Sequence, residues 1–290
     1  MIKKGIIIKS LRGRYTVAAE GQKYDCAPRG KMRGGGVYCG DWADFDDKEL
    51  VIEKIHARRN LFIRPPVANV TRVLIVTAIK PVPDFLLIDK MLVKCFKEKA
   101  EPVICMDKND LSGAEGMFDR LARDYSGAVE KIISVSAKTG DGIEKVAELI
   151  SGEGQVVCVA GQSAMGKSSI LNAVLPFIKA EVGAISLKSG RGKHTTRHTE
   201  MFALPKGGYI ADTPGFSLLE EEGIEAQELK YYYPEFLPLQ DECRYYGCNH
   251  INEPDCAVKR NIGKAVSESR HERYKEFYAE LEKYHKNKYR

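Results

Sequence analysis

The chain has 290 residues, of which 43% are hydrophobic and 29% are charged, and its formal net charge is +5. These proportions are ordinary for a soluble globular protein and exclude a fibrous or disordered chain. No stretch approaches the roughly 18 consecutive apolar residues of a membrane span. The first nine residues hold a run of only three isoleucines, which is too short for the core of a signal peptide. We therefore expect a cytoplasmic protein with no membrane partner.

The charge is unevenly distributed along the chain. Residues 1–65 carry 14 Lys/Arg against 8 Asp/Glu, and residues 258–290 carry 10 against 5, so the region between them is net acidic. Two basic ends around an acidic centre are typical of a protein that grips a polyanion with its flanks. Surface lysines are common in all proteins, so charge alone does not decide for nucleic acid.

Residues 1–65 contain five short alternating segments separated by glycine-rich turns. The segments are Gly5–Lys9, Arg14–Ala18, Lys23–Ala27, Gly36–Trp42 and Leu50–Ile55. Short strands at this spacing predict a small barrel. The prolines and arginines of Arg64-Pro65-Pro66 then predict a stiff, basic linker.

From residue 71 onward, apolar runs alternate with helical stretches. The predicted strands are Val73–Ala78, Pro102–Met106, Lys131–Val135, Gln155–Ala160, Thr199–Leu204 and Gly208–Ala211; the predicted helices are Asp84–Lys97, Ala114–Asp124, Gly142–Ile150 and Ser168–Val174. Short apolar runs of this kind are typical of buried parallel strands. The pattern predicts a doubly wound α/β domain. A cysteine-rich segment and a long, charged helix starting near Ser267 follow it.

A complete P-loop sequence follows the strand that ends at Ala160. It consists of Gly161, Gln162, Ser163, Ala164, Met165, Gly166, Lys167 and Ser168, with Ser169 next to it. Its glycines let backbone amides point at phosphate oxygens, and the start of the following helix adds its positive end. Lys167 is expected to reach the β- and γ-phosphates, and the Ser168 hydroxyl to bind Mg²⁺.

Two further segments fit the switches of such a nucleotide site. Asp212-Thr213-Pro214-Gly215 follows a strand, so Asp212 is placed to orient the Mg²⁺ shell and Gly215 to approach the γ-phosphate. Gly192-Lys193-His194-Thr195-Thr196 lies in a polar loop between this segment and the P-loop. Such a loop suits a switch in which Thr195 and Thr196 sense the γ-phosphate and Mg²⁺.

The base-binding residues are expected at the ends of two earlier strands. Asp107, Lys108 and Asp110 end one strand, and Ser136, Ala137 and Lys138 end the next. The usual guanine-binding pattern is Asn/Thr-Lys-x-Asp, so Asp107 departs from it while Lys108 and Asp110 fit. An aspartate can accept a backbone hydrogen bond but cannot donate one, which puts the anchoring of this loop in question. The other interpretation is a solvated, charged turn.

The base-binding segments precede the P-loop, whereas most GTPases begin with the P-loop. A parallel α/β sheet tolerates such a circular permutation because its termini lie at the surface. The permutation makes the chain leave this domain directly after the second switch.

Phe216 stands where many GTPases carry a water-orienting glutamine, and a phenylalanine cannot orient water. Slow intrinsic hydrolysis is therefore expected unless another group acts. His194 is the first candidate for that catalytic role and His198 the second; both could instead be surface histidines.

Three of the eight cysteines lie close together near the C-terminus. Cys243, Cys248, His250 and Cys256 offer three thiolates and one imidazole within fourteen residues. This ligand set suits a closed, structural Zn²⁺ site. The remaining five, Cys26, Cys39, Cys95, Cys105 and Cys158, are expected to be small buried side chains, because a reducing compartment disfavours disulfides.

Aromatic and basic side chains lie inside the cysteine cluster and recur in the predicted C-terminal helix. Arg244, Tyr245 and Tyr246 suit phosphate contact and base stacking. Tyr274, Phe277, Leu281 and Tyr284 recur at helical spacing, which predicts one packed face. The last eight residues are basic and aromatic, and they either contact RNA or are solvated.

The chain resembles the ribosome small-subunit-dependent GTPase A family of circularly permuted bacterial GTPases over nearly its whole length. The resemblance rests on Arg29-Gly30-Lys31, Gly40-Asp41, Arg64-Pro65-Pro66-Val67-Ala68-Asn69, the permuted nucleotide segments, Gly192–Thr196 and the Cys-Cys-His-Cys set. It implies a multidomain fold with an OB-fold β-barrel (1–65), a permuted α/β GTPase domain (66–220) and a mainly α zinc domain (221–290). Asp107 in place of Asn, and Ala164-Met165 in place of Gly-Val, depart from the family pattern.

The resemblance also implies GTP hydrolysis stimulated by the 30S subunit, contact with 16S rRNA, and a catalytic role for His194. We expect a GTP-driven, late checkpoint in 30S maturation, acting as a monomer with GTP/GDP, Mg²⁺ and one structural Zn²⁺. Two other functions remain open. One is a P-loop ATPase or small-molecule kinase, and the other is an RNA-binding assembly protein with a vestigial nucleotide site.

Overall fold

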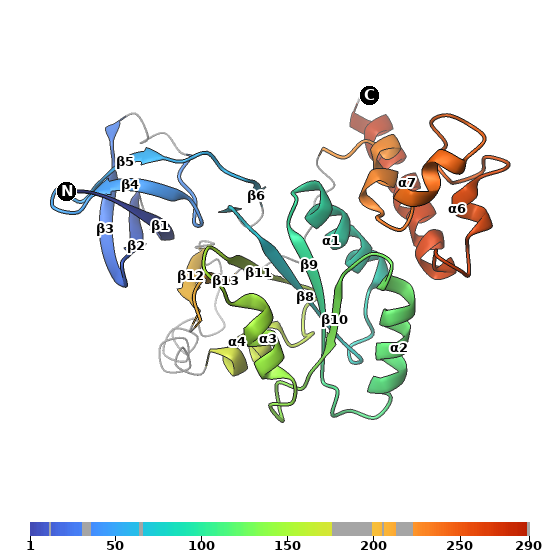
Figure 1. Ribbon diagram of the computed structural model, residues 1–290, viewed down its shortest axis with the longest axis horizontal. Helices are drawn as coiled ribbons and strands as arrows, with labels where there is room; N and C mark the ends of the chain where they lie inside the picture. The colour runs from blue at the N-terminus through green and yellow to red at the C-terminus, as the bar shows by residue number, and fades with distance from the viewer. Residues whose placement is uncertain are drawn as a thin grey trace.

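A computed structural model describes residues 1–11, 13–30, 36–63, 66–175, 199–204, 206–212 and 223–288, with the backbone alone at positions 212, 287 and 288. Figure 1 shows three parts: an N-terminal barrel, a central sheet flanked by helices, and a C-terminal helical part. This confirms the expected order of barrel, α/β domain and mainly helical domain.

The barrel is a closed ring of five strands. They are β1 (Ile2–Leu11), β2 (Arg14–Ala19), β3 (Gln22–Pro28), β4 (Trp42–Asp46) and β5 (Val51–Ile55). Strand β1 pairs with both β2 and β4, and a parallel pairing of β3 with β5 completes the ring. Alternate side chains such as Ile7, Val17 and Phe45 fill the interior and are fully buried. The topology is that of an OB-like barrel, as expected.

The fourth strand lies elsewhere than predicted. The predicted run Gly36–Trp42 is not a strand before its last residue, and the strand begins at Trp42 instead. Gly40 has a φ of +89°, and a Cβ there would lie 2.0 Å from the Ala68 carbonyl oxygen, so the chain turns at this residue. The period-2 signal comes afterwards, where buried Ala43 and Phe45 alternate with aspartates.

A short hairpin connects the barrel to the central domain. Its strands β6 (Leu61–Ile63) and β7 (Pro66–Ala68) pair antiparallel. Phe62 and Val67 are buried in the same apolar cluster as the central helices. The two strands lie on either side of the predicted boundary between residues 65 and 66, and Phe62 and Val67 pack into the core while Ile63 is exposed.

The central sheet has the strand order β10-β9-β8-β11-β13-β12. Its strands are β8 (Arg72–Ala78), β9 (Glu101–Asp107), β10 (Lys131–Ser134), β11 (Val156–Ala160), β12 (Glu200–Ala203) and β13 (Tyr209–Asp212). Only the β12–β13 pairing among these neighbours is antiparallel. Every strand predicted for this domain is present, within two residues at each end.

Helices cover both faces of the sheet (Figure 1). They are α1 (Phe85–Lys97), α2 (Ala114–Tyr125), α3 (Ile143–Ile150) and α4 (Lys167–Val174). Apolar residues of α1 and α2, such as Leu92 and Leu121, belong to one buried cluster, and those of α3 and α4, such as Val146 and Ile170, to another. This is the doubly wound arrangement that the alternating pattern predicts.

The barrel and the central sheet are joined edge to edge. Lys9 of β1 is paired with Glu200 of β12, and the Lys9 ammonium lies 3.0 Å from the Glu200 carboxylate. The Cys39 thiol also donates to the Thr199 carbonyl oxygen over 3.2 Å. The two parts therefore form one continuous, 11-stranded sheet.

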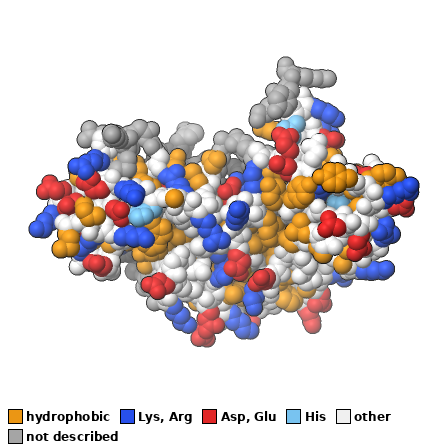
Figure 2. Space-filling view, turned by 45° about the horizontal axis from the view of Figure 1, so that its top comes forward, with side chains coloured by type: hydrophobic (Ala, Val, Ile, Leu, Met, Phe, Trp, Pro, Cys, Tyr) orange, Lys and Arg blue, Asp and Glu red, His pale blue; other side chains and the backbone are white. Residues whose placement is uncertain are grey.

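The C-terminal part is built from short helices packed on one long helix. These are η2 (Ala226–Tyr232), η3 (Leu237–Glu242), α6 (Ala257–Arg260) and α7 (Glu268–Lys288). Tyr274, Phe277 and Leu281 are buried as the spacing predicts, whereas Tyr284 is 37% exposed and ends the apolar face. Figure 2 shows Lys and Arg side chains interspersed with Asp and Glu over all three parts. Within the described ranges, none of the helices has both the length and the apolar character needed to cross a bilayer.

Candidate functional site

The predicted nucleotide residues lie along the carboxyl edge of the central sheet. The P-loop follows β11, and the two base-binding segments follow β9 and β10. Strand β11 pairs with β8 on the side opposite β9, so the order of the strands reverses across the sheet between β8 and β11. Open α/β sheets form ligand crevices at the carboxyl ends of strands at such a switch point.

Two glycines of the P-loop are required by their surroundings. Gly161 has a φ of +137°, and a Cβ there would lie 2.2 Å from the Val76 carbonyl oxygen. Gly166 has a φ of +99°, and its Cβ would lie 2.1 Å from Oδ2 of Asp107. Ser168 and Ser169 are exposed in the first turn of α4, whose N-terminus offers free backbone amides. The loop therefore has the geometry of an anion-binding site.

The ammonium group of Lys167 is folded back on the loop. It donates to the carbonyl oxygens of Gly161 and Gln162 over 2.6 and 2.7 Å. Burial lowers the pKa of this side chain, because desolvation disfavours its charge. An anion in the loop would offer a stronger partner than these two neutral carbonyls.

Gln162 connects the P-loop to helix α1. Its Oε1 accepts a hydrogen bond from the Asp84 backbone amide over 3.0 Å. Asp84 in turn caps α1, since its carboxylate accepts from the Leu87 amide over 2.9 Å. The sequence identified Gln162 as a P-loop residue but gave no indication of this second contact.

Asp107 anchors the base loop despite its departure from the usual asparagine. Its side chain is 3% exposed, and Oδ1 accepts from the Ala137 backbone amide over 2.9 Å. Its other oxygen lies against Gly166. By accepting from the Ala137 amide, the carboxylate holds the two base-binding segments together without any need to donate, and its other oxygen packs against the P-loop at Gly166.

Asp110 lies at the mouth of the same region. Its carboxylate accepts from the Ser136 hydroxyl over 2.7 Å and lies 3.8 Å from the Lys138 ammonium. The Ser136 hydrogen bond lowers the pKa of Asp110 below its ordinary value. The carboxylate is therefore ionised at neutral pH and can accept from the N1–H and N2–H groups of a guanine edge.

Lys108 connects the base loop to the P-loop from the other side. It has a φ of +65°, and its ammonium donates to the carbonyl oxygens of Lys80 and Ala164 over 2.6 and 3.1 Å. Lys108 also lines the neighbouring pocket. Its position suits packing against a planar base.

These residues line a pocket of about 440 Å³. Its walls are Asp107, Lys108, Asp110, Leu111, Ser136, Ala137, Lys138, Ser169 and Asn172. Seven of these were predicted from sequence, and Leu111 and Asn172 were not. Asn172 stands one helical turn beyond the P-loop in α4, a spacing that could have identified it. The volume falls in the range of small-molecule sites.

The predicted switch residues are only partly described. Asp212 ends β13, which pairs with β11 in parallel, so its backbone lies at the same sheet edge as the start of the P-loop. His194, Thr195, Thr196 and Gly215 lie outside the described residues, as do Gly192, Lys193 and His198.

The cysteine cluster forms a second candidate site. One ligand atom from each of Cys243, Cys248, His250 and Cys256 lies within 4.8 Å of the other three. The Nδ1 atom of His250 is 3.3 Å from the Cys256 sulfur, and the sulfurs of Cys243 and Cys256 are 4.0 Å apart. A disulfide is about 2.05 Å long, so these thiols are unbonded. Separations of 3.3–4.0 Å fit four ligands placed about 2.0–2.3 Å from one tetrahedral ion.

The protonation chemistry of the cluster also fits zinc. Burial lowers the pKa of His250 to about 4, so its imidazole is neutral at pH 7, as a ligand must be. Burial raises the pKa of Cys248 to about 12, so thiolates would form together with the bound ion. The backbone oxygen of His250 contacts Nε2 of His271 in α7 over 2.8 Å. The other five cysteines are buried free thiols, as predicted.

Comparisons with known proteins agree with this geometry. Residues 55–222 match the family described as RsgA GTPase, and residues 4–50 match the RsgA N-terminal domain. The chain is 39% identical to the small ribosomal subunit biogenesis GTPase RsgA of Caldanaerobacter subterraneus subsp. tengcongensis, covering 91% of this chain and 90% of that protein. It is 40% identical to the protein of the same name from Geobacillus thermodenitrificans, covering 96% and 97%.

Two solved structures are similar over nearly their whole length. The crystal structure of YjeQ from Thermotoga maritima has a TM-score of 0.84 at 36% identity, covering 97% of this chain and 99% of that chain. The structure of YloQ, described as a circularly permuted GTPase, has a TM-score of 0.79 at 31% identity, covering 98% and 96%.

Proposed function

The chain belongs to the RsgA GTPase family, and we propose that it hydrolyses GTP at a late checkpoint in the maturation of the small ribosomal subunit. One observation carries the nucleotide part of the proposal. Asp107 contacts both Gly166 of the phosphate-binding loop and Ala137 of the second base-binding segment. Segments far apart in the chain thus converge at one pocket. The phosphate-binding loop lies at one end of it and the ionised Asp110 at the other.

The proposed roles of the residues follow from their chemistry. Gly161 to Ser169 hold the phosphates, and Lys167 leaves its two carbonyl partners to bind the β- and γ-phosphates. Asp110 reads the guanine edge, and Lys108 and Lys138 flank the base. Ser168 and Thr196 would hold Mg²⁺ and Asp212 would orient its shell; the ion would neutralise charge on the phosphates. Thr195 and Gly215 complete the switches, and His194 orients the attacking water.

The other two domains provide the contacts to the particle. We propose that the barrel (1–65) and the zinc domain (221–290) bind 16S rRNA on either side of the GTPase domain (66–220). Tyr246 is fully exposed, Tyr245 is 44% exposed, and the Arg244 side chain is 65% exposed and paired with Asp255. Exposed aromatic and guanidinium groups can stack on unpaired bases. One Zn²⁺ on Cys243, Cys248, His250 and Cys256 would hold this loop in shape.

The proposal includes a cycle in which GTP-bound protein docks on the immature subunit and hydrolysis releases it. The relatives carry small ribosomal subunit biogenesis in their names. The protein is proposed to act as a cytoplasmic monomer. Its partners would then be GTP or GDP and the 30S particle.

The test is a GTPase assay with and without purified 30S subunits, on wild type, Lys167→Ala and His194→Ala. We expect the subunits to accelerate hydrolysis steeply in wild type, Lys167→Ala to abolish turnover, and His194→Ala to lose most of the stimulation while retaining GTP binding. Equal turnover with and without subunits would contradict the checkpoint. Undiminished stimulation in His194→Ala would remove that histidine from the mechanism.

Competition of GTP against ATP separates the GTPase from a P-loop ATPase or kinase. An RNA-binding protein with a vestigial nucleotide site would associate with 30S subunits equally in every nucleotide state, also as Lys167→Ala. The hydrogen-bonded, ionised Asp110 favours guanine over adenine, and so the GTPase over a P-loop ATPase or kinase.

A further inference from the structure

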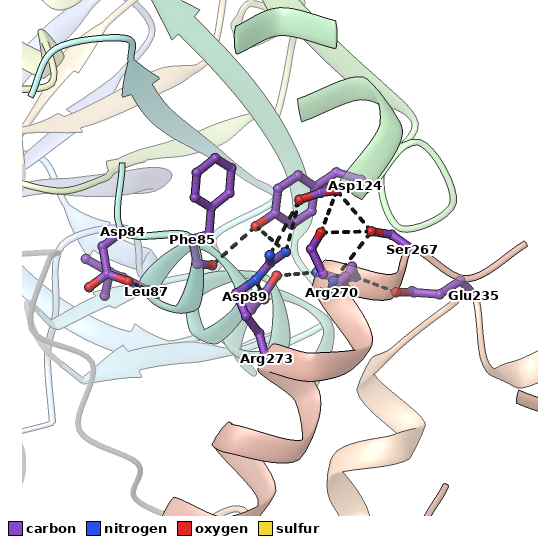
Figure 3. Close-up of polar contacts among 11 residues, drawn as sticks. Asp84, Phe85, Leu87, Asp89, Asp124, Glu235, Ser267, Arg270 and Arg273 are labelled. Carbon is purple, nitrogen blue, oxygen red and sulfur yellow. Dashed lines mark hydrogen bonds and ion pairs between the residues drawn. The ribbon is translucent and has the colours of Figure 1, made fainter. Parts of the chain in front are cut away.

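Helix α7 of the C-terminal domain is joined to the GTPase domain by a buried ionic cluster (Figure 3). Arg270 is 1% exposed, and its guanidinium donates to Asp89 of α1 over 2.5 Å and also to Glu235. Arg273, one turn further along α7, donates to the second oxygen of Asp89. Both oxygens of a fully buried carboxylate in α1 are thus held by α7.

Helix α2 completes the cluster. The Asp124 carboxylate accepts from the hydroxyls of Ser267 and Ser269 over 2.9 and 2.8 Å, at the first turn of α7. A carboxylate at this end of a helix interacts favourably with its dipole. Burial opposes the charge of Arg270, but Glu235 and Asp89 outweigh it and raise the pKa of Arg270 above its ordinary value. The Arg270 guanidinium is therefore charged where it joins the two domains.

A second contact reaches the start of α1. Arg273 donates to the hydroxyl of Tyr125 over 3.3 Å, and this hydroxyl donates to the Phe85 carbonyl oxygen over 3.2 Å. Phe85 is the first residue of α1 and follows Asp84, whose amide donates to the P-loop side chain of Gln162. Helix α7 therefore holds α1 at its middle and at the turn that contacts the P-loop.

The P-loop and α1 also pack closely together. Gln162 and Met165 of the loop line a small cavity of about 10 Å³ with Leu87, Ile88 and Met91 of α1. A displacement of α1 would be transmitted to the loop, because packed interiors leave little room for independent movement. His271, the neighbour of Arg270 in α7, contacts the backbone oxygen of His250 in the cysteine cluster.

We propose that Asp89 and Tyr125 are positioning residues for the phosphate-binding loop, through which the C-terminal domain sets the affinity of the site for nucleotide. The inference rests on the proposed function in one respect: it takes Gly161–Ser169 as the phosphate-binding loop. Arg270 and Arg273 hold α1 in the orientation at which Asp84 binds Gln162. By reciprocity, a bound nucleotide stabilises the docking of α7 on α1.

The test measures binding of N-methylanthraniloyl-GDP to the full-length protein by fluorescence. Asp89→Asn and Tyr125→Phe should each weaken the affinity about fivefold or more, the scale of moderate coupling between sites. Glu280→Gln is the matched control, because Glu280 pairs with Lys90 across the same two helices but outside the cluster. It should leave the affinity unchanged. Zinc content and melting temperature report whether the C-terminal domain remains folded.

The decisive comparison is a double-mutant cycle with Gln162→Ala. If the effect passes through the Asp84–Gln162 contact, Asp89→Asn should change the affinity by less than about twofold in the Gln162→Ala background. The same loss in both backgrounds would overturn the proposal, as would wild-type affinity in an Asp89→Asn protein that retains its zinc. If Asp89→Asn does not fold, the cycle is carried out with Tyr125→Phe, which removes one hydroxyl and retains the ring.

No ribosome takes part in this measurement. A failure of 30S subunits to accelerate hydrolysis would therefore contradict the proposed function and leave these affinities as they are. Conversely, additive effects in the cycle would overturn the positioning role without touching ribosome stimulation.

Discussion

Oδ2 of Asp107, the last residue of β9, lies 2.1 Å from the point where a Cβ on Gly166, in the loop after β11, would stand. The base-binding segment and the phosphate-binding loop are therefore in direct packing contact at these two residues. A substitution at Asp107 or Gly166 is therefore expected to affect both loops.

Gly166→Ala should abolish nucleotide binding and lower stability by about 1–3 kcal/mol, because the new methyl group meets the buried carboxylate at a strained φ. Gly154→Ala is the control. Gly154 also has a positive φ, +74°, but nothing lies within 4 Å of its Cβ position. It should cost only the backbone strain and leave binding intact. Denaturant unfolding measures the stability of the two variants, and nucleotide titration measures their binding. Equal effects at the two glycines would contradict a packing contact between Gly166 and Asp107.

Asp107→Asn should bind GDP more tightly than wild type, by about 3- to 10-fold. The amide keeps an oxygen for the Ala137 amide and removes a buried negative charge beside the phosphate seat. Asp107→Ala removes the acceptor as well and should bind more weakly than wild type. Calorimetric titration compares the three proteins. Weaker binding by Asp107→Asn would contradict this prediction and show that the carboxylate contributes to nucleotide binding in a way that an amide cannot replace.

Asp110→Asn should lower the preference for GTP over ATP by about 10- to 100-fold, since hydrogen bonds to a charged group contribute about 1.5–3 kcal/mol. An asparagine amide can donate to the 2-oxo group of xanthine, so the variant should gain affinity for xanthosine triphosphate. Competition assays with the three nucleotides measure this. A preference for GTP that persists unchanged would place guanine recognition elsewhere in the pocket.

Cys256→Ala should lose the single zinc and lower the melting temperature of the protein, because Cys256 belongs to the same buried cluster as Tyr233 and Phe236. Cys95→Ala, which changes a buried thiol of α1 outside the metal site, should keep one zinc per chain. Elemental analysis and thermal unfolding provide the measurements. One zinc per chain in Cys256→Ala would exclude the four-ligand site.

Features encoded locally could be predicted from the sequence. The P-loop needs eight consecutive residues, and the four metal-ligand candidates fall within fourteen, so residue type and local spacing were enough to predict them. The central strands were found because buried parallel strands are continuous apolar runs. The fourth barrel strand was misplaced because the apolar residues Val37 and Cys39 are buried without being in a strand.

Contacts between distant residues could not be predicted in this way. Arg270 and Asp89 are 181 residues apart, and each is an ordinary charged position in an amphipathic helix pattern. Nothing in their spacing distinguishes them from solvated residues such as Glu272. Burial of both side chains depends on how two domains dock, which one-dimensional periodicity does not contain.

The edge-to-edge joint between the barrel and the central sheet also bears on the order in which the protein assembles during its synthesis. Lys9 is among the first residues to be made, and its partner Glu200 follows 191 positions later. The barrel can close its own ring early, because all five of its strands end by Ile55. The edge of β1 at Lys9 can pair with β12 only after Glu200 has been synthesised. Until then, the nascent barrel exposes that strand edge.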